Sequence, residues 1–227
     1  MSHHLAILAY GSLLADPGAE LVPAIVDRRP VQTPFAVEYA RSSSSRCGAP
    51  TLVKVEKPGI GAPVRARLLL LRDDMTVEAA RDMLYRRETN HVGEKNVTYD
   101  DERQRKRRNA GKDVVIIETL RDFEGVRAVL YADLPPSDDF LLDDAISPED
   151  KANKLACLAI QSVTRETFCS QRDGIRYLAD AICHDIHTPL TETYRAAVLR
   201  CADDAPDLET ARQRIARRKD LVPEEHV

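Results

Sequence analysis

The sequence LAILAYGSLLADPG, residues 5–18, decides how the chain begins to fold. Residues 5–9 form a short apolar run bounded by turn residues, which is typical of a buried strand rather than a helix. Gly11 follows almost at once, and a glycine there lets the chain turn with a positive φ or lets a ligand approach the backbone without meeting a Cβ. A strand, a tight turn and free amides beside the Ser12 hydroxyl are one way in which proteins hold a small anionic group. An ordinary turn after a first strand explains the same residues, so the rest of the chain has to decide between the two.

The composition is that of an ordinary soluble globular protein. The 227 residues are 43% hydrophobic and 31% charged, and the formal net charge of -4 gives no basic excess that would attract nucleic acid or a membrane. No apolar run approaches about 20 residues and the first residues lack a basic region, so we expect neither a membrane span nor a signal peptide. The five cysteines form no CxxC pair, which favours free thiols in a reducing cytosol and predicts a cytoplasmic protein.

Short apolar runs predict a β-rich first part, and helical periodicity predicts a second part made of helices. Strands are expected over 35–39, 51–56, 64–71, 114–119 and 126–132, with 51–56 and 64–71 paired, and a weak helical segment over 20–26. Further helices are expected over 148–167, 174–186, 191–202 and 207–219. We therefore predict an α+β protein with a core over 1–136 and an all-helical C-terminal region over 147–222.

One carboxylate stands where the pattern of a helix calls for an apolar residue. A helix is predicted over 77–88, with Thr76 as its N-cap. At 100° per residue, Glu88 falls within about 20° of Val77 and so lies at the edge of the apolar face, whereas Arg86 is expected to point to solvent. A carboxylate in apolar surroundings has a raised pKa, which suits a general acid/base at neutral pH. A structural ion pair between Glu88 and Arg87 is the alternative interpretation.

These motifs together resemble the γ-glutamylcyclotransferase-like family, which includes the AIG2-like and ChaC-type proteins. In that family a Tyr-Gly-Ser loop follows the first strand, here YGSL at residues 10–13, and a glutamate on a later helix does the chemistry, here Glu88 in LYRRETNHVG. The stretch SSSRCGAPTLV, residues 43–53, is similar to the Arg-Gly-x-Pro stretch of ChaC-type members. The resemblance covers roughly residues 5–132 and implies a small mixed β-barrel with flanking helices. Leu13 departs from the Asn that many members carry at the end of the loop.

The resemblance implies a lyase that cyclises a γ-glutamyl compound to 5-oxoproline and releases an amine or amino acid. Glu88 is the expected general acid/base, and the amides of the loop would bind the substrate carboxylate or the developing oxyanion. The expected substrate-binding residues are Tyr10, Gly11, Ser12, Leu13, Arg46 and Gly48. Because the attack is intramolecular, the reaction needs neither a metal nor a cofactor.

Two functions of other classes also fit parts of the sequence. A non-catalytic relative would use the same pocket to bind a γ-glutamyl compound or another small acidic ligand. The basic run RQRKRRNAGK, residues 103–112, raises a nucleic-acid function, but it lacks interleaved aromatics and follows an acidic triplet, which favours a solvated segment and no nucleic-acid partner. Residues 183–187, CHDIH, carry metal-capable side chains without a second ligand cluster, so no metal site is expected.

Overall fold

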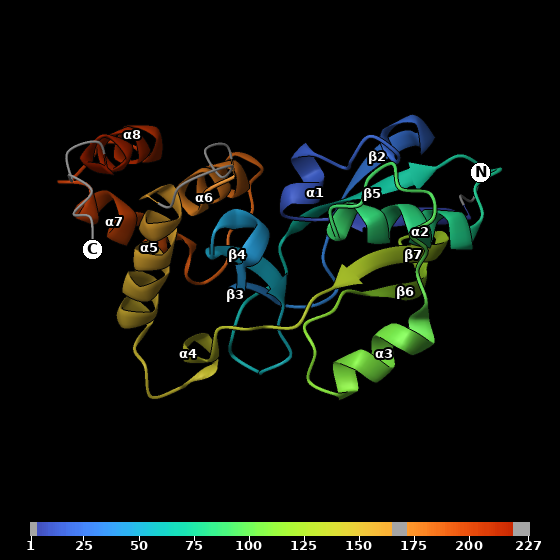
Figure 1. The fold of residues 1–227 in the computed structure, drawn as a ribbon, viewed down its shortest axis with the longest axis horizontal. Coiled ribbons are helices and arrows are strands. Elements are labelled where there is room, and N and C mark those ends of the chain that lie inside the picture. The colour runs from blue at the N-terminus through green and yellow to red at the C-terminus, as the bar shows by residue number, and fades with distance from the viewer. Residues whose placement is uncertain (1–3, 165–171, 220–227) are drawn as a thin grey trace. The chain divides into compact units, whose positions relative to one another are not determined.

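The computed structural model describes residues 4–164 and 172–219, and the chain divides into two compact units (Figure 1). Met1–Phe35 and Pro63–Pro135 form the first unit, and Ala36–Ala62 and Pro136–Val227 form the second. The chain is a mixed α+β protein, as the sequence predicts. The predicted domains, 1–136 and 147–222, stay a prediction; in the structure, residues 36–62 group with the C-terminal part of the chain.

The first unit is built on a five-stranded sheet in the order β2-β5-β1-β7-β6. The strands are β1 (Leu5–Ala9), β2 (Ile25–Gln32), β5 (Arg65–Leu71), β6 (Ile116–Phe123) and β7 (Val126–Asp133). The central strand, β1, pairs antiparallel with β5 and parallel with β7. All five of its residues are buried, and a strand covered on both faces needs an apolar residue at every position. This explains the unbroken run LAILA.

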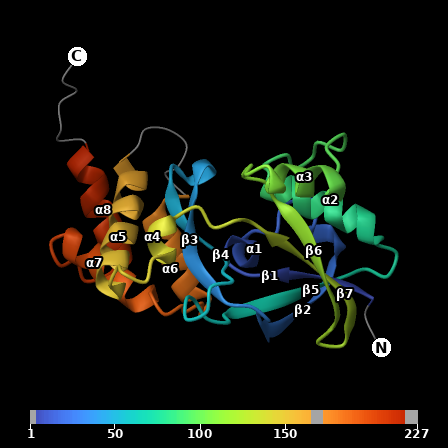
Figure 2. The ribbon, with the colours of Figure 1, turned by 90° about the horizontal axis from the view of Figure 1, so that it is seen from below.

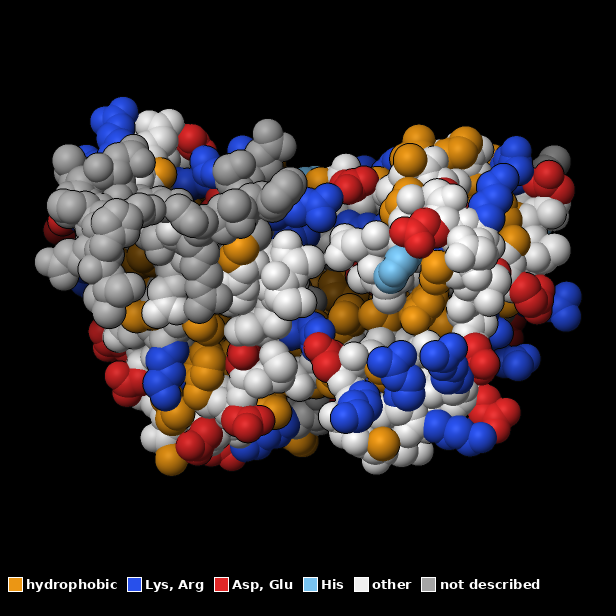
Figure 3. All heavy atoms as spheres, in the orientation of Figure 1, with side chains coloured by type: hydrophobic (Ala, Val, Ile, Leu, Met, Phe, Trp, Pro, Cys, Tyr) orange, Lys and Arg blue, Asp and Glu red, His pale blue; other side chains and the backbone are white. Residues whose placement is uncertain are grey.

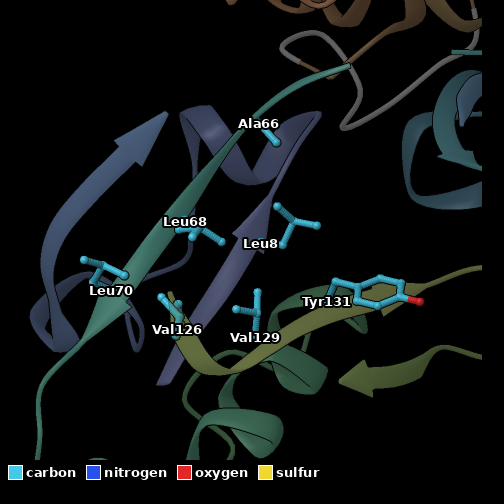
Figure 4. Close-up of a cluster of buried hydrophobic side chains, with 8 residues drawn as sticks. Leu8, Ala66, Leu68, Leu70, Val126, Val129 and Tyr131 are labelled. Carbon is cyan, nitrogen blue, oxygen red and sulfur yellow. The ribbon is translucent and has the colours of Figure 1, made fainter. Parts of the chain in front are cut away.

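The core of this unit includes alternate residues of the central strands. Leu8, Leu68 and Val129 lie in one cluster of buried side chains that also includes Tyr131 (Figure 4). The helix α2 (Val77–Glu88) packs against β6 and β7 (Figure 2). The short helix α1 (Ser12–Ala15) follows β1, and α3 (Asp101–Asn109) packs against β6. The strands predicted at 114–119 and 126–132 are confirmed as the hairpin β6–β7.

The sheet is open, so the residues that the structure describes do not form the closed barrel that the family resemblance implies. Its edge strands, β2 and β6, share no backbone ladder. A side-chain hydrogen bond connects the two edges, because Arg29 Nη1 on β2 donates to the Glu124 carbonyl in the β6–β7 turn (3.2 Å). A side-chain contact of this kind leaves both edges without the continuous backbone hydrogen bonds that close a barrel.

Two predictions about the local elements are wrong. The predicted pair 51–56 and 64–71 does not form, because β5 lies between β1 and β2 while β4 (Ala49–Lys54) pairs with β3 (Val37–Ser43). The predicted helical segment over 20–26 is a short 3-10 turn, Val22–Ala24, followed by the edge strand β2. Edge strands tolerate charged residues and proline, so the sequence IVDRRPVQ lacks the apolar alternation by which strands are recognised.

The second unit combines the β3–β4 hairpin with helices. They are α4 (Asp139–Leu142), α5 (Pro148–Thr164), α6 (Gly174–Cys183), α7 (Thr191–Cys201) and α8 (Leu208–Lys219), and a 3-10 turn, Ser44–Arg46, links the two strands. The helix α5 packs against α6, α7, α8 and β4. The four predicted helices are confirmed, except that α6 ends three residues before its predicted end at 186; residues 165–167 of the first lie outside the described residues.

Candidate functional site

The loop after β1 adopts a backbone conformation that requires glycine. Gly11 has φ 57° and ψ -133°, a region that side-chain-bearing residues avoid. The first intrahelical bond of α1 runs from the Leu14 amide to the Gly11 carbonyl (3.2 Å). The amides of Ser12 and Leu13 precede that bond, and such groups at the start of a helix have no intrahelical acceptor. The expected positive φ of Gly11 is confirmed.

The flanking loop residues divide between the core and the surface. Leu13 is buried, so its side chain contributes to packing and only its amide is suited to a ligand. Tyr10 is half-buried and lies edge-on to Phe35, with ring centroids 5.9 Å apart. The loop is therefore fixed on both sides, by a buried leucine and by an aromatic contact.

The helix α2 carries Glu88 as its last residue, and its start is as predicted. The Thr76 hydroxyl accepts a hydrogen bond from the Ala79 amide (3.1 Å), which confirms the N-cap. The Glu88 side chain is 12% exposed. A carboxylate at the C-terminal end of a helix meets the negative end of the helix dipole, so its position is electrostatically unfavourable without a nearby cation.

Arg87 supplies that cation and connects Glu88 to the loop. Its Nη1 donates to Glu88 Oε1 (2.9 Å), and its Nη2 donates to the Ser12 hydroxyl oxygen (3.1 Å). The structural ion pair that the sequence allowed is thus present. The same guanidinium also brings Ser12 and Glu88, two of the predicted site residues, into one cluster within the first unit.

Arg86 does not point to solvent, and that prediction is wrong. It is 6% exposed, and its Nε lies 3.0 Å from both carboxylate oxygens of Glu20. The Arg86 guanidinium holds the pKa of the Glu20 carboxyl below its usual value. Glu20 also accepts a hydrogen bond from the Gly93 amide. Helical periodicity predicted exposure because it considers only the neighbours of Arg86 on the same helix. In the structure, the segment after α1 covers this side of α2.

Arg46 and Gly48 lie in the second unit. The guanidinium carbon of Arg46 lies 4.8 Å from the centre of the Tyr177 ring, a cation–π contact. Gly48 has φ 81° and its amide donates to the Ser43 carbonyl (2.8 Å), so it closes the turn between β3 and β4. Within their unit, both residues therefore have structural partners, and their assignment to a substrate site stays a prediction.

The expectation of five free thiols is wrong. Cys47 is disulfide-bonded, while Cys157, Cys183 and Cys201 are free and exposed; Cys169 lies outside the described residues. The cysteines therefore no longer argue for a reducing compartment, and cytoplasmic localisation stays a prediction. Across the residues that the structure describes, no helix has the length and apolarity to cross a bilayer.

The basic run 103–112 lies mostly on α3, and Figure 3 shows Lys and Arg side chains gathered where that helix lies. Several of these charges are paired. Arg105 contacts Asp101 and Glu118, and Arg108 contacts Asp133. The run is thus a salt-bridged surface helix, which is the solvated segment that the sequence predicts.

A buried carboxylate that sequence reasoning missed lies in the second unit. Glu38 on β3 is 1% exposed, and its Oε1 accepts hydrogen bonds from the Thr188 hydroxyl (2.6 Å) and the Tyr39 amide (2.9 Å). Burial raises the pKa of this carboxyl to about 7. Its signal in the sequence was a single acidic residue inside the apolar strand FAVEYA.

Among the residues described, no three His, Cys, Asp or Glu side chains are grouped so as to hold a metal ion. Comparison of the chain with family models, curated proteins and solved structures gives no match.

Proposed function

We propose that the protein is a γ-glutamylcyclotransferase-like lyase with Glu88 as its general acid/base. The observation that carries the proposal is the double contact of Arg87, which joins the Ser12 hydroxyl and the Glu88 carboxylate. This chemistry needs two components. One is a loop whose backbone amides have no intrahelical acceptor, and the other is a carboxylate of low exposure. They come from sequence positions more than seventy residues apart.

The proposed reaction transfers protons and requires no water. The α-amine of the γ-glutamyl group attacks its own γ-carbonyl carbon, a C–N bond forms, and the original amide C–N bond breaks. Glu88 accepts a proton from the attacking amine and donates one to the leaving nitrogen, so 5-oxoproline and a free amine are the products. The amides of Ser12 and Leu13 would stabilise the oxyanion of the tetrahedral intermediate. The intramolecular geometry supplies the proximity that other enzymes gain by binding two substrates.

The proposal does not depend on a closed barrel. It rests on the local arrangement in the first unit, where β1 is the central strand of an open sheet and the loop follows β1 directly. Arg46 and Gly48 belong to the second unit, and the proposed mechanism assigns them no role.

The test is to incubate the purified protein with a panel of γ-glutamyl peptides, amino acids and amines, and to follow 5-oxoproline and the released amine by mass spectrometry. We expect product from the native protein and a loss of at least about 100-fold in Glu88→Gln, because a positioned acid/base contributes about 10²–10⁴-fold. Glu94→Gln is the matched control, since Glu94 is exposed and lies six residues beyond Glu88. Equal product from native protein and Glu88→Gln would refute the role of Glu88.

Calorimetric titration with the same compounds separates catalysis from binding. Heat of binding without turnover would overturn the proposed reaction in favour of the binding function, with the γ-glutamyl group as ligand. Binding retained in Glu88→Gln together with lost turnover would establish that Glu88 acts in chemistry rather than in affinity.

A further inference from the structure

Arg87 makes more contacts than a partner for one carboxylate requires. Its Nε and Nη2 both donate to the Asp16 carbonyl (3.1 and 2.8 Å), in addition to the contacts of Nη2 with Ser12 and of Nη1 with Glu88. A guanidinium has five N–H donors, and these four contacts leave one on Nη1. The side chain is 13% exposed. Arg87 therefore joins both ends of the α1 segment to the end of α2.

The chain is shaped around the stem of this arginine. Gly18 has φ +90°, and a Cβ placed on it would lie 2.9 Å from Arg87 Cγ. The Gly18 amide donates to Asp16 Oδ1 (3.0 Å), which closes the turn over the side chain. The turn at residues 16–18 thus accommodates Arg87 sterically and presents the carbonyl that accepts two of its hydrogen bonds.

We infer that Arg87 is a positioning residue for the proposed cyclisation, which holds the Ser12 loop and the Glu88 carboxylate in a fixed relative orientation. The inference rests on the proposed function. Arg87 acts through the two groups that it bonds, the hydroxyl of the loop and the acid/base. Its planar fork serves acceptors in different directions at once, which a lysine ammonium at the end of a flexible stem does not reproduce.

Removal of the fork is expected to lower the rate more than the affinity. A displacement of about 1 Å between reacting groups costs on the order of 100-fold in rate. We expect Arg87→Ala to lower kcat by about 100-fold while KM changes by less than about threefold, because Arg87 is expected to touch the site residues rather than the substrate. Arg87→Lys should retain an intermediate kcat, since it keeps the charge and part of the hydrogen bonding.

The experiment measures kcat and KM on the γ-glutamyl compound that the native protein turns over best. It compares Arg87→Ala, Arg87→Lys and Arg103→Ala, the last as a control at an exposed arginine of α3. Guanidinium chloride far below denaturing concentrations should restore kcat in Arg87→Ala, and methylammonium chloride at the same concentration should not. Rescue by guanidinium but not by methylammonium shows that the planar fork sets kcat, and an unchanged urea unfolding curve for Arg87→Ala excludes a loss of folded protein as the cause.

Three results would overturn the inference. Native kcat in Arg87→Ala refutes it and leaves the proposed function standing. A kcat defect that guanidinium does not relieve, with unfolding in urea shifted to match, reduces Arg87 to a structural residue. No turnover of any γ-glutamyl compound by the native protein refutes the proposed function and the inference with it.

Discussion

Glu38 offers a direct test of how burial controls ionisation in the second unit. Its carboxylate is enclosed between β3 and the loop before α7, where the Thr188 hydroxyl donates to Oε1 (2.6 Å). Its Oε2 is buried without a hydrogen-bond partner among the described residues. Lys151 on α5 is the cation that acts on it, and Tyr39 is the neighbouring titratable group. Ionisation would place negative charge on a carboxylate that is shielded from water, so burial makes the folded state favour the protonated acid.

The sign and size of the effect follow from the two pKa values. Burial raises the pKa of Glu38 from 4.5 to about 7. At about 1.36 kcal/mol per pKa unit, the folded protein loses about 3 kcal/mol of stability when Glu38 ionises. The stability that the raised pKa contributes is fully present below pH 4.5, the pKa of Glu38 in the unfolded chain. It is lost as the pH rises through about 7, the pKa of Glu38 in the folded protein. The largest part of the loss is therefore expected between about pH 5 and pH 8.

Glu38→Gln removes the titration and keeps the shape of the side chain. We would measure the free energy of urea unfolding by circular dichroism at several pH values from 5 to 8, for the native protein and for the variant. The free energy of unfolding of Glu38→Gln, relative to that of the native protein, should rise by about 2–3 kcal/mol from pH 5 to pH 8. Because the cost of the new amide group does not depend on pH, it cancels from this change.

Two controls make the Glu38 result specific. Glu56→Gln, at an exposed carboxylate of the same unit, should follow the native pH profile. Hydrogen exchange should locate the destabilisation at high pH in peptides from β3 and α7. A difference between native protein and Glu38→Gln that stays constant from pH 5 to pH 8, with both folded, would refute the reasoning.

Two further predictions concern the turn before β5 and the ion pair between Arg86 of α2 and Glu20. Gly61→Ala should lower the free energy of unfolding by about 1–3 kcal/mol more than Gly59→Ala, measured in urea. Both glycines have positive φ, but a Cβ on Gly61 would lie 2.7 Å from the Val37 carbonyl oxygen, whereas Gly59 faces open space; equal losses would contradict this account. Glu20→Gln should cost about 3 kcal/mol by the same measurement, because it leaves the buried Arg86 without its anion, and a loss below about 1 kcal/mol would show that water or another group compensates.

The elements that the sequence predicted well are those in which local signals and burial agree. The helix over 77–88 has a capping threonine and an apolar face, and both appear in the structure. The helix α5 begins at Pro148 and has Glu149 and Asp150 in its first turn, and it is confirmed as far as Thr164. The strand β2 was missed because most of its residues are exposed at a sheet edge, so burial imposes no periodic pattern on them.

Local sequence patterns could not predict which strands pair, for a different reason. Runs 51–56 and 64–71 are separated by a glycine-rich turn, which is a common hairpin signal. The pairing instead follows from contacts far along the chain, since β5 joins β1 and β2. Val37 and Ala62 form an antiparallel bridge, in which the Val37 amide donates to the Ala62 carbonyl (2.9 Å) and the Ala62 amide donates to the Val37 carbonyl (3.3 Å). These contacts direct the chain away from a hairpin before β5 begins.

The candidate site shows why a residue's role depends on which segments meet. Periodicity placed Glu88 at the margin of the apolar face, and the low exposure of its side chain agrees with that position. No helical wheel represents Asp16 or Ser12, the residues that turn Arg87 from a simple ion-pair partner into a link between two segments. The helix dipole disfavours a carboxylate at the C-terminal end of a helix. Natural proteins tend to keep such unfavourable residues at functional positions. The arginine offsets the local cost and, through the same guanidinium, aligns the loop. A purely structural pair would need only the first of these effects, so the shared contact with Ser12 is the feature that favours function.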